Sequence, residues 1–307
     1  MKRKKALLLF NGSAGTGKIG KNAYQIVSAF AAEGYEPVVY PVLPERHIGA
    51  EEILREAGED CALVVCGGGD GTLHHTIAAL MTLDEKKRPA LGYIPAGSTN
   101  DFAKGLRIPT DIRRACEVIL QGTELACDVG SFNGKYFTYV AAFGAFSGVS
   151  YTTDQSFKNV LGHAAYVLSA LAAIPENIGF ERHMVVETDD GEREEGDYLF
   201  GAVCNAASLG GFRLPKAMRA RFDDGLLELL LIKAPANAAE IPEILAALTG
   251  NDITKSPFIH VRRISGARFL FGDKTAWTLD GEYGGEVKRA QVRCVRGALS
   301  IRAPKGT

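Results

Sequence analysis

The sequence has almost no net charge and no long uninterrupted apolar run. Its 35 Lys and Arg residues nearly balance 36 Asp and Glu residues, which gives a formal net charge of -1. We therefore expect no overall positive field that would draw the chain onto nucleic acid. The most apolar longer segments, 136–149 and 160–174, are interrupted by Gly or Ser and fall short of the roughly 18 residues that a membrane-spanning helix needs. We expect no transmembrane segment.

Cysteine is scarce, and its spacing excludes the common disulfide and metal motifs. The six cysteines lie mostly within apolar runs, with no CxxC pair and no His at ligand spacing. We expect these cysteines to be small core residues of a protein in a reducing cytosol. The apolar run after the basic tip MKRKK (1–5) is too short for a signal peptide, so we expect a cytoplasmic protein. The tip itself is open to two interpretations, a contact with an anionic membrane surface or a solvated lead-in to the first strand.

What the sequence does have is a glycine-rich segment, LVVCGGGDGT (63–72), directly after an apolar, β-branched run. Three glycines allow a sharp turn and a close approach of the backbone to a ligand. The backbone N–H groups of such a turn, followed by a helix N-terminus at Thr72, can cradle phosphate. Asp70 would repel phosphate unless a cation lay between them, which suggests that it binds Mg²⁺ or abstracts a proton. The alternative is a tight strand-to-helix turn with no ligand.

The periodicity divides the chain into two domains. Over residues 1–124, apolar strands alternate with amphipathic helices, which predicts a doubly wound, mainly parallel sheet with ligands at the carboxyl ends of its strands. Over residues 125–295, short β runs separated by turns predict an antiparallel β-sandwich. One helix that is apolar nearly all round, 160–173, interrupts this second domain and is either buried or lines a greasy cavity. The segment 296–307 is a candidate to complete the first domain.

Two further loops belong to the first domain. IPAGSTNDFAK (94–104) follows another strand of the same sheet and would bring hydroxyls, an amide and the Asp101 carboxylate to the same crevice as Asp70. GSAGTGK (12–18) matches the first part of a P-loop. Ile19 follows it, where a P-loop has the Ser or Thr that binds Mg²⁺, and this disfavours a true P-loop.

Two acidic turns lie in the second domain. In WTLDGEYGG (277–285), Asp280 and Glu282 are two residues apart, so in an extended segment they would point the same way, and one of them could accept a hydroxyl proton. ARFDDGLL (220–227) is either a small cation site made of a carboxylate and backbone oxygens or a turn that enters a strand.

Taken in order, these segments resemble the diacylglycerol kinase family of soluble bacterial lipid kinases, which is related to NAD kinases and sphingosine kinases. The segments that carry the resemblance are NGSAG (11–15), GGDGT (68–72), PAGSTND (95–101), DGL (224–226) and DGE (280–282). The resemblance implies an NAD kinase/diacylglycerol kinase-like fold. It also implies an ATP- and Mg²⁺-dependent transfer of the γ-phosphate to the hydroxyl of a neutral lipid, with diacylglycerol giving phosphatidate.

The resemblance also implies roles for individual residues. Asp280 or Glu282 would deprotonate the lipid hydroxyl, with Asp70 in the catalytic set. A structural Mg²⁺ would be held by Asp224 and by backbone oxygens near Arg221 and Leu226. Asp128 and Asn205 match further polar positions of the family. The nucleotide and its Mg²⁺ would be bound by Asn11, Gly12, Ser13, Ala14, Gly15, Gly68, Gly69, Asp70, Gly71, Thr72, Leu73, His74, Ser98, Asn100 and Asp101.

The chain departs from the family pattern at several positions. Gly12 and Thr16 replace the usual Pro and Lys of the first loop, His75 replaces a Glu, and Ser169 replaces a Lys. These departures keep two alternatives open: a kinase for NAD or a small polyol, and a regulator that binds nucleotide or lipid without turnover. The expected partners are a lipid substrate met peripherally at a membrane surface and, as an open alternative, a second copy of the chain; none is a nucleic acid.

Overall fold

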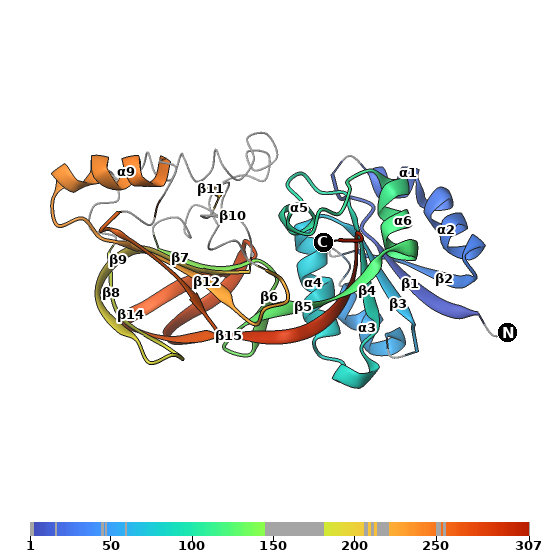
Figure 1. Cartoon of the computed structure of the whole chain (residues 1–307). Helices are drawn as coiled ribbons and strands as arrows, with labels where there is room; N and C mark the ends of the chain where they lie inside the picture. Colours follow the sequence, from blue (N-terminus) through green and yellow to red (C-terminus); the bar gives the residue numbers. More distant parts are fainter. Residues whose placement is uncertain are drawn as a thin grey trace. The chain divides into compact units, whose positions relative to one another are not determined.

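The computed structural model separates the chain into two compact units. Unit 1 is formed by residues 1–127 together with 297–307, and unit 2 is formed by residues 128–296. Figure 1 shows the elements of each unit. The structure describes residues 3–15, 17–43, 46, 48–58, 60–144, 181–205, 208–209, 212–213, 221–249, 253 and 256–306. The apolar helix predicted over 160–173 lies outside these residues, as do Thr16 and Ser169.

Unit 1 is built on a parallel sheet. Its strands are ordered β2 (Tyr35–Pro41), β1 (Lys4–Phe10), β3 (Leu63–Gly68) and β4 (Ala90–Pro95), and all three pairings are parallel. From Ala6 to Phe10 in β1 and throughout β3, every residue is apolar or glycine and is buried, as is typical of a sheet covered by helices on each side. The predicted parallel sheet is confirmed.

Two groups of helices cover the two faces of this sheet (Figure 1). Helices α2 (Ala23–Ala32) and α6 (Ile112–Gln121) contact each other and pack their apolar residues onto alternate side chains of β1 and β3. Helices α3 (Ala50–Ala57) and α4 (Asp70–Leu80) also contact each other, and α4 packs on β3. Shorter helices are α1 (Lys18–Lys21), η2 (Glu85–Lys87) and α5 (Asp101–Gly105).

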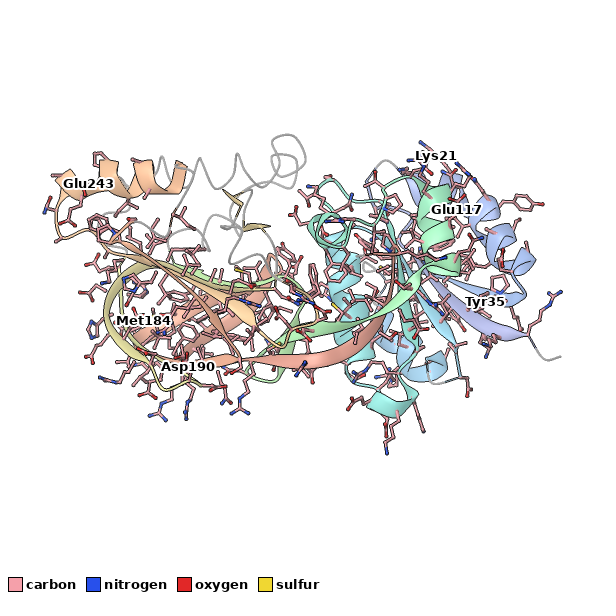
Figure 2. The ribbon with its side chains drawn as sticks, viewed as in Figure 1. Lys21, Tyr35, Glu117, Met184, Asp190 and Glu243 are labelled. Carbon is pink, nitrogen blue, oxygen red and sulfur yellow. The ribbon has the colours of Figure 1, made fainter. Side chains whose placement is uncertain are left out.

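Unit 2 is mainly antiparallel, as predicted. Its long strands pair with different neighbours along their length: β9 pairs with β8 through Arg193–Tyr198 and with β7 through 200–204. The sheet therefore folds over a shared aromatic core, in which Trp277 packs against Phe143 and Phe269. Met184 of β8, labelled in Figure 2, belongs to the same core. The bounds are β6 Lys135–Phe137, β7 Val140–Gly144, β8 Arg182–Thr188, β9 Arg193–Cys204, β10 Ser208–Leu209, β11 Phe212–Arg213, β12 Leu227–Lys233, η5 Ala238–Glu240, α9 Ile241–Thr249, β13 Ile259–Ile264 and β14 Gly266–Leu279.

The chain passes between the units through two strands. Strand β5 (Thr123–Phe132) leads out of unit 1, and β15 (Glu282–Ala303) leads back into it. Near its end, β15 runs parallel to β4, with Ile301 paired to Leu91. Leu299, Ile301 and Ala303 are buried there. The segment around 297–307 thus supplies the neighbour of β4 in the sheet of unit 1.

Two observations bear on the expectations about the membrane and the thiols. Among the described residues, no helix is long and apolar enough to cross a bilayer. All six cysteines are free thiols, and five of them are buried. Burial raises the pKa of the Cys66 thiol to about 12, so this side chain is an inert core residue.

Candidate active site

Three loops of unit 1 converge at the carboxyl ends of β1, β3 and β4. The backbone N–H of Asn11 donates to the Gly67 carbonyl at 2.9 Å, and that of Ala96 donates to the Gly68 carbonyl at 2.8 Å. The loops after β3 and β4 touch through glycines, since a Cβ added to Gly97 would lie only 2.7 Å from the Cα of Gly69. This crossing of bare backbones explains why the sequence has glycine at both positions.

The loop after β1 is tied to the helix that follows β3. The Asn11 amide donates to the Thr72 hydroxyl at 2.9 Å, and its carbonyl oxygen accepts from the Ser13 N–H at 3.0 Å. Gly15 has a φ of 57°, and a Cβ there would meet the Ala96 carbonyl at 2.3 Å, so glycine is required. Lys18, the first residue of α1 after this loop, donates its side-chain N–H to the Thr110 carbonyl at 2.5 Å. It therefore lies on the α6 side of the loop.

Asp70 is the first residue of α4 and the most unusual group of the site. Its Oδ2 accepts from the Thr99 hydroxyl at 2.8 Å, which joins the loops after β3 and β4. Its Oδ1 is buried and has no hydrogen-bond partner among the described residues. Burial raises the pKa of the Asp70 carboxyl; the Thr99 hydrogen bond lowers it, the nearby Asp101 carboxylate raises it, and the backbone N–H groups of Asp101 and Asn100 lower it slightly. A buried carboxylate oxygen without a donor, beside a second carboxylate, fits a divalent cation.

Asn100 maintains the shape of its own loop. It adopts a left-handed backbone with φ 51° and is 5% exposed. Its side chain accepts from the Gly97 N–H at 2.9 Å and donates to the Gly97 carbonyl at 2.8 Å. The Tyr93 hydroxyl lies beneath it, 3.4 Å from the Asn100 Oδ1. Asn100, predicted as a nucleotide contact, thus has its amide occupied by the loop.

The remaining predicted residues of unit 1 divide by exposure. Leu73 is fully buried in the core, so only its backbone faces the site. His74 is half-buried, His75 is exposed, and their rings stack edge to face at 5.3 Å. Asp101 begins α5 and forms an ion pair with Lys104 at 3.2 Å. The other predicted loop residues lie on the three converging segments: Gly12, Ser13, Ala14, Gly68, Gly71 and Ser98.

In unit 2, Asp280 and Glu282 are not parts of one extended segment, which corrects the expectation that they point the same way. Asp280 (φ 52°) and Gly281 (φ 91°) form the two-residue turn between β14 and β15, and Glu282 is the first residue of β15. Two positive φ values are typical of the type I′ hairpin turn. Only Gly and small polar residues adopt this geometry readily, which accounts for the Asp-Gly pair.

The Asp280 carboxylate is buried and saturated with hydrogen bonds. Its Oδ2 accepts from the Thr138 N–H and hydroxyl, both at 2.7 Å, and its Oδ1 accepts from the N–H groups of Tyr139 at 2.9 Å and Val140 at 3.0 Å. A carboxylate has about four acceptor positions, and all are filled. Glu282 is exposed.

The predicted metal ligands of unit 2 have a different arrangement. Asp224 Oδ1 accepts from the Leu226 N–H at 3.0 Å, and its Oδ2 forms an ion pair with the Arg263 guanidinium. Arg221 pairs with Asp223 at 3.3 Å. Within the described residues, no group of three or more His, Cys, Asp or Glu side chains is arranged to hold a metal ion. The carboxylate of Asp224, the side chain predicted to bind the metal, is instead engaged by Arg263 and the Leu226 N–H.

The polar residues Asp128 and Asn205 are buried beside the same turn. Asp128 Oδ2 accepts from the Gly225 N–H at 2.6 Å, and its carbonyl accepts from the Asn205 amide at 2.8 Å. The Asp128 side chain thus binds the backbone of the turn, and the Asn205 side chain binds the backbone of Asp128. Asp128 is 1% exposed and Asn205 is 0% exposed.

Comparisons with known proteins were made at the level of sequence and of structure. A family model described as the diacylglycerol kinase catalytic domain matches residues 5–132, and one described as the YegS C-terminal NAD kinase beta sandwich-like domain matches residues 140–303. A diacylglycerol kinase of Bacillus subtilis is 32% identical over 288 residues, which are 92% of this chain and 91% of the relative. The chain belongs to the diacylglycerol kinase family. A Staphylococcus carnosus diacylglycerol kinase is 28% identical to this kinase over 93% of its chain and 90% of the relative.

Solved structures share the fold of this lipid kinase. A diacylglycerol kinase from Bacillus anthracis superposes with a TM-score of 0.74 at 21% identity, covering 99% of this chain and 98% of the other. Yeast NADH kinase gives a TM-score of 0.55 at 10% identity, covering 98% and 83%. The predicted fold class is confirmed.

Sequence reasoning missed several polar residues of the kinase. The sequence places the Thr99 hydroxyl in the crevice but does not predict its hydrogen bond to Asp70, and Thr138 belongs to no motif. Glu228 is the one charged residue within the apolar run LELLLI (227–232), and it faces Arg263 across the β12–β13 pairing. A charge inside a buried strand was the available signal for Glu228.

Proposed function

We propose that this lipid kinase transfers the γ-phosphate of ATP to the hydroxyl of diacylglycerol, met at a membrane surface, and releases phosphatidate. The observation that carries the proposal is the buried, partnerless Oδ1 of Asp70 at the point where three glycine-bearing loops converge. Family membership supports ATP as the phosphate donor. Positioning and charge neutralisation dominate phosphoryl transfer, and a backbone cradle with a cation-binding carboxylate provides both.

Unit 1 would hold the nucleotide and its metal. Backbone N–H groups of the loops containing Gly15, Gly69 and Gly97 would donate to the phosphates. The carboxylates of Asp70 and Asp101 would hold Mg²⁺, with Thr99 fixing the orientation of Asp70. When bound, the ion would neutralise charge on the phosphate oxygens.

Unit 2 would supply the base. Asp280 has no acceptor position left for a substrate hydroxyl, because four donors already fill them. Glu282 is exposed and follows directly in the same hairpin. We therefore assign the general base to Glu282 and give Asp280 a positioning role, in which it fixes the segment Thr138–Val140 and the turn that carries Glu282.

The test is transfer of labelled γ-phosphate from ATP, with Mg²⁺, to diacylglycerol in mixed micelles, run beside a total lipid extract and NAD. We expect label in phosphatidate. Glu282→Gln should lower kcat about 10²–10⁴-fold with an unchanged melting temperature, because it removes only the base. Glu286→Gln, an exposed glutamate further along β15, is the matched control and should keep full activity.

Asp280→Asn separates the two roles. Its amide group would face backbone donors, so we expect a lower melting temperature together with the loss of activity. A Glu282→Gln variant with wild-type kcat would refute the assignment of the base. Label in NAD or in another lipid would keep the phosphoryl-transfer chemistry and replace the acceptor. No label in any acceptor, from a folded protein that binds ATP, would overturn the proposed reaction.

A further inference from the structure

The turn between residues 221 and 226 contains an acidic residue whose two carboxylate oxygens are both engaged by the protein. Asp224 Oδ1 accepts from the backbone N–H of Leu226 at 3.0 Å, and Oδ2 forms an ion pair with Nη2 of Arg263. The side chains of Asp224 and Arg263 are 17% and 33% exposed. A divalent ion on Asp224 would have to displace the guanidinium.

Arg263 is held where it is by the register of two strands. It lies on β13 directly opposite Glu228 of β12, and its Nε is 3.7 Å from Glu228 Oε1. The planar guanidinium thus lies between two carboxyl groups, one on the turn and one on the strand that follows the turn. The close ion pair is the one with Asp224; Nε of Arg263 and both Glu228 oxygens are buried without a hydrogen-bond partner among the described residues, so the contact with Glu228 is electrostatic only.

Other positive charges surround the same turn. The aliphatic stem of Arg296 packs on Gly225, where an added Cβ would lie 3.0 Å from the Arg296 Cδ. Arg221, at the start of the turn, is paired with Asp223 at 3.3 Å. Arg263 is therefore the guanidinium that engages Asp224, while Arg221 is taken up by Asp223 and Arg296 covers Gly225.

The two aspartates beside the turn are already engaged by the protein. Mg²⁺ takes six oxygens at about 2.0–2.1 Å in octahedral geometry, and in proteins it keeps several waters and is held by one or two carboxylates. Asp224 is engaged by Leu226 and Arg263, and Asp128, another buried carboxylate beside the turn, accepts the Gly225 N–H at 2.6 Å. Among the residues that the structure describes, no cluster of three or more acidic, His or Cys groups is placed to bind a metal.

We propose that the Arg263 guanidinium is the resident cation of this turn, in place of the divalent metal that the family resemblance implies at Asp224. The stability of unit 2 then needs no divalent ion. Any dependence of the enzyme on Mg²⁺ belongs to the nucleotide site of unit 1, so this inference stands or falls independently of the proposed reaction.

The test is thermal unfolding of the full chain without nucleotide, in excess MgCl₂ and in excess EDTA, together with the metal content after dialysis against MgCl₂. We expect the wild-type melting temperature to be the same in both buffers and the content to be well below one Mg²⁺ per chain. Arg263→Gln should lower the melting temperature by about 4–8 °C in EDTA. The matched control is Arg262→Gln. Arg262 is the preceding residue on β13 and pairs more loosely, with Glu192 at 3.5 Å, so this substitution should change the melting temperature little.

The opposing result is equally specific. The proposal would be overturned if the wild-type melting temperature were higher in MgCl₂ than in EDTA and Asp224→Asn abolished the difference. It would also be overturned if the wild type bound about one Mg²⁺ per chain and Asp224→Asn removed it. If Arg263→Gln fails to fold, the wild-type comparison and the metal content still decide. Binding of Mg²⁺ near Asp70 is distinguished because it survives Asp224→Asn.

Discussion

Individual carboxylates in this kinase differ sharply in what surrounds them, and the differences assign their roles. Asp280 accepts four hydrogen bonds, whereas Asp70 has one buried oxygen without any donor. The first arrangement stabilises the carboxylate in the folded state by itself. The second leaves a cost of burial that a bound cation would offset. On the proposed function, the same residue type would therefore serve structure in one hairpin and ligand binding in the other unit.

Thr138 contributes two of the donors to Asp280, one of them its hydroxyl. Thr138→Val should lower the free energy of unfolding by about 1.5–3 kcal/mol, the range for a hydrogen bond to a charged group. Thr278→Val is the matched control, because its buried hydroxyl makes only a 3.4 Å hydrogen bond to the Ala142 carbonyl. Denaturant unfolding of both variants measures the difference. Equal losses would mean that the Thr138 hydroxyl does not support Asp280.

Asp70→Asn should separate stability from activity. We expect kcat/KM for ATP to fall at least about 10²-fold, because the metal loses a charged ligand. The melting temperature should stay the same or rise, since a buried carboxylate with an unpartnered oxygen becomes a neutral amide. Asp60→Asn, at an exposed turn of unit 1, is the control. A parallel loss of stability and activity in Asp70→Asn would contradict a ligand role for Asp70.

The loops after β3 and β4 were largely predictable because the sequence features that specify them are local. A buried strand that ends in glycines and an aspartate places Gly69 and Asp70 at a sheet edge, and the parallel order brings Thr99 beside them. The environment of Asp280 was not predictable, because it depends on backbone N–H groups about 140 residues earlier in the chain. Likewise, the pairing of Asp224 with Arg263 follows from the register of β12 and β13, which no short motif encodes.

Among the elements, the loops after β3 and β4 depend on each other through Gly69 and Gly97. Gly97→Ala would place a Cβ 2.7 Å from the Gly69 Cα and push the loops apart. We expect the Kd for ATP, measured calorimetrically, to rise about tenfold or more, with a small effect on stability. Gly20→Ala in α1 is the control, because an added Cβ there meets nothing within 4 Å. An unchanged Kd in Gly97→Ala would place the nucleotide away from these loops.

Strand β12 has a buried glutamate that makes stability depend on pH. Burial raises the pKa of Glu228 from 4.5 to about 8, although Arg263 at 3.7 Å opposes the rise. The folded state therefore keeps the proton after the unfolded chain has lost it. Stability must fall as the pH rises through this window, by about 1.4 kcal/mol per pH unit, and must level off above it.

Glu228→Gln tests this linkage. The variant keeps the shape of the side chain but cannot ionise, so the free energy of unfolding should decline less between pH 5 and 8 than in the wild type. Urea unfolding across that range measures both slopes. Because the other titrating groups are shared, the difference between the slopes reports Glu228 alone. Identical slopes would show that Glu228 is ionised in the folded protein throughout the range.

At the scale of the whole molecule, unit 1 is assembled from two distant parts of the sequence. Removing residues 297–307 would take away the neighbour of β4 and the buried side chains of Leu299 and Ile301. Burial of two such side chains contributes about 3–6 kcal/mol, so the amide hydrogens of residues 90–94 should exchange with solvent at least about 100-fold faster. Removal of residues 304–307 alone, beyond β15, is the control. Unchanged exchange in the longer deletion would mean that unit 1 folds without this strand.

The interrupted course of unit 1 also sets an order of events during synthesis. Nascent domains usually fold in the order in which they leave the ribosome. Here all residues of unit 2 are contiguous and emerge before the 297–307 segment that joins the sheet of unit 1. The sheet of unit 1, although it begins first, is completed last. A released chain that ends before residue 297 would therefore contain all residues of unit 2 and an unfinished sheet edge on β4, which is the surface on which we expect chaperones to act.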